Sequence, residues 1–84
     1  MTTRINQPVK VLAAFDSKRM GLKPLQLKWN NAVYRLGKVD FFHATKKGAE
    51  RIYHFSLCDE TGGTYMKLAF YTHSLIWVLE EVEG

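Results

Sequence analysis

The sequence has very little cysteine and no long apolar run, and both absences narrow the range of possible structures. Its 84 residues include a single cysteine, Cys58, which excludes an internal disulfide and any zinc site that needs a pair of cysteines. No stretch approaches the roughly 18 apolar residues of a membrane-spanning helix, and residues 1–7 lack the apolar segment of a signal peptide. We therefore expect a cytoplasmic protein that does not enter a membrane.

Linkers, internal repeats and low-complexity segments are also missing, which favours a single folded unit. A chain of 84 residues has room for one domain, and its 46% hydrophobic and 13% aromatic residues exceed the content of a disordered segment. We expect one domain over residues 1–84, with residues 1–7 as a loose N-terminal arm.

Alternation of apolar and polar side chains predicts β-strands along most of the chain. In residues 25–29, Leu, Leu and Trp alternate with Gln and Lys, which is typical of a strand with one face on a core. Asn30-Asn31 follows, and asparagine tolerates the positive φ angles of a tight two-residue turn. Residues 32–36 should therefore fold back on residues 25–29 as a hairpin.

Gly37 marks a change in this pattern. After it the apolar phase shifts by one residue, which predicts a β-bulge and places Val39, Phe41 and His43 toward the core, with Phe42 out of phase. Turn-forming residues then separate three more strands. The side chains expected in the core of these strands are Tyr53, Phe55, Leu57, Met66, Leu68, Phe70, Leu75, Trp77 and Leu79.

The first and last segments each fit a strand or a helix. Residues 8–15 alternate as a strand, whereas Pro8 at a first turn and Gly21 as a stop fit a helix. Ser74 could cap a helix over residues 75–82, but the glutamates that follow would lie at the negative end of its dipole. We favour strands for both segments.

About six closely spaced strands without a crossover helix predict an all-β protein with antiparallel pairing. Such a chain forms a single small barrel, SH3-like or similar, or a strongly bent sheet, because closure hides the edge strands that otherwise aggregate.

Several core and turn positions resemble those of a group of short bacterial proteins. They are the run Lys23-Pro24-Leu25-x-Leu27-x-Trp29, then Tyr34, Tyr53-x-Phe55, and the ending Leu75-x-Trp77-x-Leu79-Glu80-Glu81. This arrangement is similar to small all-β domains of unknown function in which a Trp strand precedes an Arg-and-Tyr strand. The resemblance covers roughly residues 9–83 and departs at Asn30-Asn31, where the related pattern often has Gly-Arg. It implies a fold and no activity.

Groups that could carry catalysis or bind a metal are few and poorly spaced. His43, His54 and His73, even with Cys58 and Asp59, lack the close spacing of familiar metal sites. No residue pattern marks an activated nucleophile or an oxyanion site, and Gly62-Gly63 lacks the lysine and the helix of a phosphate-binding loop. We expect no enzyme activity, no metal and no cofactor.

The charge is distributed unevenly along the chain. Residues 1–51 hold eleven Lys or Arg and three acids, a net charge of +8, whereas residues 52–84 have a net charge of −4. Basic loops beside exposed aromatic residues on a small barrel are typical of proteins that bind single-stranded nucleic acid. The candidate nucleic-acid-binding residues are Lys18, Arg19, Lys23, Lys46, Lys47, Arg51, Phe42, Tyr65 and Tyr71.

A second hypothesis uses the same aromatic residues differently. They would form the contact patch of a protein-interaction or self-association domain, together with a strand edge. On this hypothesis the partner is another protein or a second copy, so the chain is a monomer or a homodimer.

Overall fold

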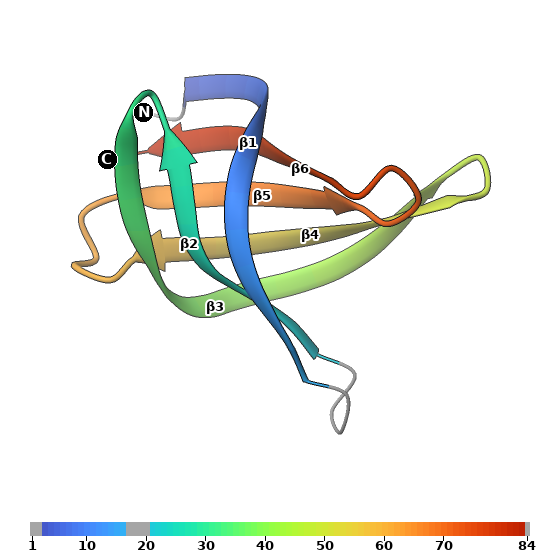
Figure 1. Ribbon diagram of the computed structural model, residues 1–84, viewed down its shortest axis with the longest axis horizontal. Helices are drawn as coiled ribbons and strands as arrows, with labels where there is room; N and C mark the ends of the chain where they lie inside the picture. The colour runs from blue at the N-terminus through green and yellow to red at the C-terminus, as the bar shows by residue number, and fades with distance from the viewer. Residues whose placement is uncertain (1–2, 17–20, 84) are drawn as a thin grey trace.

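Six segments with alternating side chains form strands in the computed structural model, which describes residues 3–16 and 21–83. Each strand pairs antiparallel with the next, and β6 pairs with β1, which closes a barrel (Figure 1). The strands are β1 (Thr3–Asp16), β2 (Gly21–Trp29), β3 (Ala32–Lys47), β4 (Glu50–Asp59), β5 (Tyr65–Tyr71) and β6 (Ile76–Glu83). The prediction of a small all-β antiparallel barrel is confirmed, and both ambiguous segments are strands.

The start of the chain belongs to this barrel. Residues 3–7, expected as a loose arm, form the first part of β1, where Thr3 and Arg4 pair with Val82 and Glu81 of β6. Residues 1–2 lie outside the described part of the chain.

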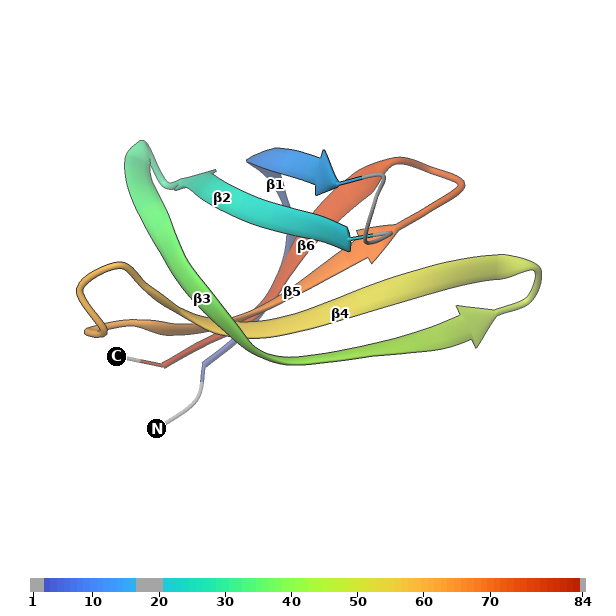
Figure 2. The same ribbon diagram turned by 90° about the horizontal axis from the view of Figure 1, so that it is seen from below.

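The barrel consists of two layers, because β1 and β3 each change neighbours partway along their length. The five-stranded layer contains residues 3–9 of β1, β6, β5, β4 and residues 36–47 of β3. The three-stranded layer contains residues 10–16 of β1, β2 and residues 32–35 of β3. Figure 2 shows β1 and β2 in one layer facing β4 and β5 in the other. We call the side of each layer that faces the barrel interior its inner face.

Two tight turns follow directly from their residues. Asn30 and Asn31 have φ angles of 51° and 62°, and Trp29 pairs with Ala32, so the predicted two-residue hairpin is confirmed. Gly48, with a φ of 62°, opens the two-residue turn between Lys47 and Glu50.

Gly37 lies at the corner where β3 leaves the three-stranded layer. The β3–β4 register shifts between Leu36 and Val39, which confirms the predicted bulge. A Cβ atom on Gly37 would lie 3.2 Å from the backbone oxygens of both Cys58 and Asp59, so the close approach of β4 favours glycine here.

A second register shift, between Val39 and Phe41, was not predicted. It inverts the orientation of the residues that follow. Phe42 lies opposite the buried Phe55 on the inner face, whereas Phe41 lies opposite Ser56 on the outer face and is 59% exposed. The placement of Phe41 in the core was therefore wrong, and Phe42 is the residue of the pair that is in phase.

The core lies between the two layers and matches most of the predicted positions. Three other expected core residues are exposed: Leu25 at the β1–β2 register shift, His43 beside His54 on the outer face, and Leu75 in the β5–β6 turn. The placement of His43 toward the core was wrong for the same reason as that of Phe41, because the unpredicted register shift inverts the residues after it. The buried core residues are Leu27, Phe55, Leu57, Met66, Leu68, Trp77 and Leu79.

Candidate nucleic-acid interface

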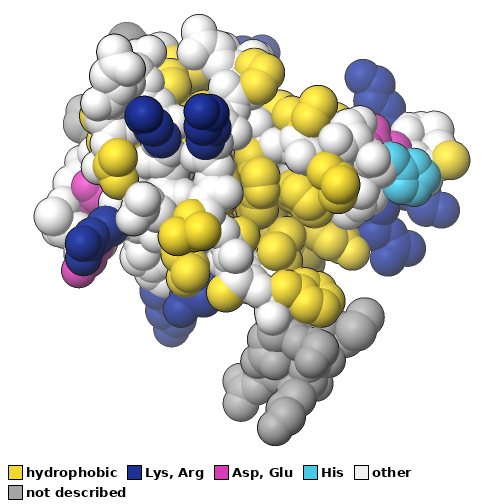
Figure 3. Space-filling model, in the orientation of Figure 1, with side chains coloured by type: hydrophobic (Ala, Val, Ile, Leu, Met, Phe, Trp, Pro, Cys, Tyr) yellow, Lys and Arg dark blue, Asp and Glu magenta, His cyan; other side chains and the backbone are white. Residues whose placement is uncertain are grey.

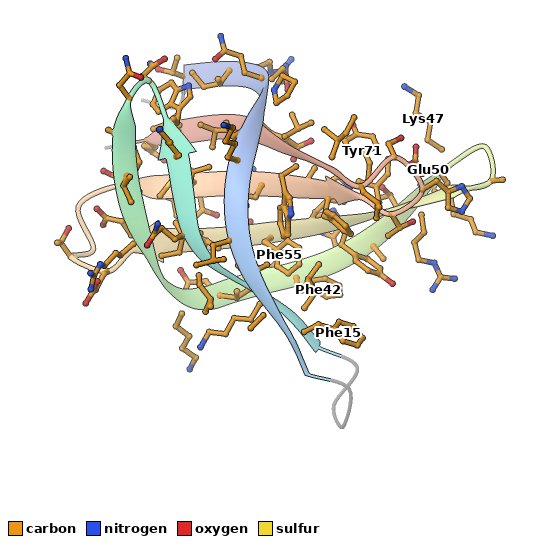
Figure 4. All side chains as sticks on the ribbon, in the orientation of Figure 1. Phe15, Phe42, Lys47, Glu50, Phe55 and Tyr71 are labelled. Atoms are coloured by element: carbon orange, nitrogen blue, oxygen red, sulfur yellow. The ribbon has the colours of Figure 1, made fainter. Side chains whose placement is uncertain are left out.

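The basic residues chosen from the sequence do not form one rim in the described part of the chain. Lys18 and Arg19 lie outside the described residues. Lys46 pairs with Arg51 and Lys47 with Glu50 at the tip of the β3–β4 hairpin, which is the end of the barrel where Figure 4 shows Lys47 and Glu50. Lys23 is in β2, which pairs with β1 and with residues 32–35 of β3, and it lines a groove with Arg35 and Lys38 instead.

The three candidate aromatic residues are not brought together either. Phe42 is on the inner face of the five-stranded layer, with its ring 5.1 Å from that of Phe55. Tyr65 and Tyr71 are half-buried and lie near opposite ends of the outer face of β5, about 20 Å apart along the strand. The expected stacking surface made of all three is therefore not formed.

A different group of cations converges on the outer face of the three-stranded layer. Its inner face packs on the core through residues such as Val11, Leu27 and Tyr34, so the residues that alternate with them point outward to solvent. Figure 3 shows Lys and Arg side chains over β1 and β2 on this side of the molecule. We call this surface the basic face and define it by Lys10, Lys23, Lys28 and Arg35 of the three-stranded layer, together with Lys38, which follows the corner in β3 and lines the same hollow as Lys23 and Arg35. All five side chains are exposed.

The charges of the basic face are not neutralised within the described chain. Lys10 and Lys28 lie directly opposite each other on β1 and β2, an arrangement of like charges that destabilises a sheet. No ion pair among the described residues involves any of the five cations. Among the described residues, acidic side chains line hollows of this face only near Arg35. Glu60 lines the hollow that Lys23 and Lys38 also line, and Asp59 and Glu60 line a further hollow with Arg35. The face therefore has a positive potential that an external anion could satisfy.

Three adjoining hollows run along the basic face. Their volumes are about 520, 240 and 490 Å³. Lys10 and Lys28 line the first and the second, and Leu12 and Gln26 line the second and the third. They extend from the Asn30-Asn31 turn to Lys23, about 23 Å along β2. An extended polyanion could follow this track and contact a cation in each hollow.

The outer face of the five-stranded layer has the opposite character. Lys67 Nζ lies 3.7 Å from Glu81 Oε2, and His54 Nδ1 lies 3.4 Å from Glu80 Oε1. His54 also stacks on His43, with ring centroids 4.6 Å apart, and its Nε2 is 2.8 Å from Thr45 Oγ1 in a hydrogen bond. A hollow of about 260 Å³ opens here, and Phe41 is one of its lining residues. Lys67 is thus paired with a carboxylate, and two glutamates add negative charge, so this face offers less to an anion.

Two other carboxylates are held by turns. Partial burial opposes ionisation of Asp59, but hydrogen bonds donated by Thr64, Thr61 and Gly63 outweigh it and lower the pKa of Asp59 below its ordinary value. Glu50 is held in the same way by the β5–β6 turn. Both are occupied by internal donors and do not contribute an open site.

Sites of other kinds are not formed by the described residues. Among residues 3–16 and 21–83, no three His, Cys, Asp or Glu side chains are arranged to hold a metal ion. The described chain also contains no helix of the length and apolarity needed to cross a membrane. Cys58 is a half-buried free thiol opposite Tyr65.

Sequence reasoning missed four of the five cations of the basic face, because it searched the turns. Lys10, Lys28, Arg35 and Lys38 are on strands, and the signal was present in the polar phase of the alternation. The polar positions of three consecutive strands contain lysine, arginine and glutamine and no acid before Asp16 or between Gly21 and Val39. Comparison of this chain with known protein families, with curated proteins and with solved structures found no match in any of the three, so the resemblance to short bacterial proteins stays a prediction.

Proposed function

We propose that this protein binds nucleic acid through its backbone phosphates, on the basic face. The observation that carries the proposal is the set of adjoining hollows lined by five cations that have no ion-pair partner among the described residues. Two of these cations lie directly opposite each other on neighbouring strands. Such an arrangement destabilises the free protein, and polyanion binding would convert it into a favourable one.

The chemistry of the face favours phosphate contacts over base stacking. Its exposed apolar side chains are aliphatic, namely Leu12, Leu25 and Val33, and no described aromatic side chain lines the three adjoining hollows. Single-strand-binding proteins hold bases on aromatic rings, which this face lacks in the described residues. We therefore propose binding with little dependence on base sequence, to duplex as well as to single-stranded nucleic acid.

The experiment is a fluorescence-anisotropy titration of labelled duplex and single-stranded DNA and RNA over a range of salt concentrations. If all five cations contact phosphates, the slope of log K against log salt should be about −4 to −5 for duplex DNA and about −3 to −4 for single strands. An absence of binding at low salt would contradict the proposal.

A pair of charge-matched double variants locates the site. Lys10→Glu with Lys28→Glu should weaken binding at least about tenfold, because two phosphate contacts become repulsive. Lys47→Glu with Arg51→Glu makes the same change of net charge at the β3–β4 tip and should have a much smaller effect. Equal losses in the two double variants would show a non-specific effect of net charge and would contradict the assignment to the basic face.

A further inference from the structure

One side of β3 is an unpaired strand edge. Residues 36–47 of β3 pair with β4, but β2 pairs with β3 only through residues 32–35. Among the described residues, β3 contacts no other strand. Since alternate residues of an antiparallel strand direct their N–H and C=O groups to opposite sides, every second residue of 39–47 directs them away from β4.

The middle of this edge, residues 41–45, lacks the features that usually prevent edge-to-edge pairing. Natural sheets protect their edges with charged side chains, proline or bulges. Residues 41–45, with the sequence Phe-Phe-His-Ala-Thr, contain no Lys, Arg, Asp, Glu or Pro, and the bulge lies before them. Phe41 is 59% exposed on the outer face, and Phe42 is 49% exposed on the inner face.

Apolar side chains are also exposed next to this edge on the inner face of the five-stranded layer. Figure 3 shows apolar side chains in the region between β1 and the β3–β4 hairpin, where the three-stranded layer does not cover the five-stranded layer. Phe15, which is 67% exposed, is drawn over the edge near Phe42 in Figure 4, and Figure 2 places their two strands in facing layers. A strand added beside β3 would therefore meet apolar groups on both of its faces.

We propose that a second copy of this chain pairs with the edge, with the two β3 strands antiparallel about a two-fold axis at His43. In this register Asp40 lies opposite the partner's Lys46, and the symmetry forms that pair twice. Phe42 lies opposite the partner's Ala44 and Phe41 opposite the partner's Thr45, so each large ring faces a small side chain. The two five-stranded layers become one continuous sheet.

The charge pattern selects this register over its neighbours. An axis at Phe42 would place Lys38 opposite the partner's Lys46, which is repulsive. An axis at Ala44 would place Phe42 opposite the partner's Lys46 and would leave Asp40 without a cation opposite it. Asp40 comes before the uncharged segment 41–45, and Lys46 and Lys47 come after it. In an antiparallel pair of two such strands, the acid of each strand therefore lies near the lysines of the other.

Engineered cysteines test the register directly. In a Cys58→Ser background, His43→Cys should form an intermolecular disulfide on mild oxidation, because directly opposite residues have the Cα separation that a disulfide requires. Thr45→Cys is the matched control, since the two Thr45 positions would lie about 13 Å apart along the pair, beyond the reach of a disulfide. Equal cross-linking of both variants, or of neither, would overturn the register.

Sedimentation velocity on the 84-residue chain tests the dimer itself, with charge variants as probes. Asp40→Lys and Lys46→Asp should each raise the dimer dissociation constant about tenfold, and the double variant Asp40→Lys/Lys46→Asp should restore it. Failure of the double variant to restore dimerisation would overturn the proposed pairing. A monomer at every soluble concentration would overturn the dimer and leave the edge for a strand of another protein.

Discussion

The two outer faces of this small barrel differ in whether their charged side chains have partners. On the five-stranded layer, Lys67 is paired with Glu81 and His54 with Glu80. On the three-stranded layer, Lys10 lies opposite Lys28, and none of the five cations has an ion-pair partner among the described residues. One face thus has ion-pair partners within the fold, whereas the five cations of the other have none among the described residues.

The largest effect that we expect concerns the corner that separates the two layers. Gly37→Val should lower the free energy of unfolding by about 1–3 kcal/mol, because its Cβ would press against the backbone oxygens of Cys58 and Asp59 at 3.2 Å. Gly21→Val is the control, since no heavy atom lies within 4 Å of its Cβ position, and it should change stability by less than about 0.5 kcal/mol. Urea denaturation measures both, and equal losses would contradict the account of the corner.

Smaller changes in stability are expected from charge reversal on each face, and they test whether the two faces differ in electrostatic strain. Lys28→Glu should stabilise the protein by about 0.2–1 kcal/mol, because a like-charge pair with Lys10 becomes an opposite-charge pair, and it should weaken nucleic-acid binding. Lys67→Glu should instead destabilise the protein by up to about 1 kcal/mol, because it places like charges opposite each other at Glu81. Thermal unfolding measures the two shifts, and loss of stability in Lys28→Glu would show that the basic face is not electrostatically strained.

The local features of the fold could be predicted because their causes are local. Strand alternation, the positive φ angles that Asn30 and Asn31 tolerate, and the phase shift at Gly37 are each visible within a few residues. The bulge before Phe41 was not predictable in this way, because residues 39–43 contain no glycine and alternate acceptably in either phase. Its position depends on how β3 pairs with β4, which is a long-range property.

The candidate site was harder to predict for a related reason. Turn lysines such as Lys46 and Lys47 stand out in the sequence, whereas Lys10, Lys28 and Arg35 read individually as the solvent side of separate strands. Only the pairing of β1, β2 and β3 places these cations on one face. The sequence signal that would have identified the basic face is the presence of like charges at the polar, alternating positions of consecutive strands.

At the β3–β4 tip, the carboxylate of Glu50 is stabilised by hydrogen bonds from within the protein. Its Oε2 accepts hydrogen bonds from the backbone N–H of Ser74 at 2.9 Å, from Ser74 Oγ at 3.0 Å and from the backbone N–H of His73 at 3.0 Å. The hydrogen bond from the Ser74 backbone contributes most to lowering the pKa of Glu50 below its ordinary value of 4.5. A carboxylate with a lowered pKa in the folded state stabilises that state fully above its unfolded pKa, and this contribution is lost as the pH falls through the folded pKa.

The smallest effect that we expect is therefore a change in acid sensitivity. In Glu50→Gln the melting temperature should fall less between about pH 5 and pH 3 than in the parent protein, because the ionised group that acid neutralises has been removed. Asp59, whose pKa is also lowered, is present in both proteins, so its contribution to acid sensitivity cancels in the comparison. If Glu50→Gln lost stability in acid as steeply as the parent protein, the contact between the β3–β4 tip and the β5–β6 turn would not depend on the charge of Glu50. The turn would then be held by the hydrogen bond that Thr72 Oγ1 donates to the Arg51 carbonyl oxygen.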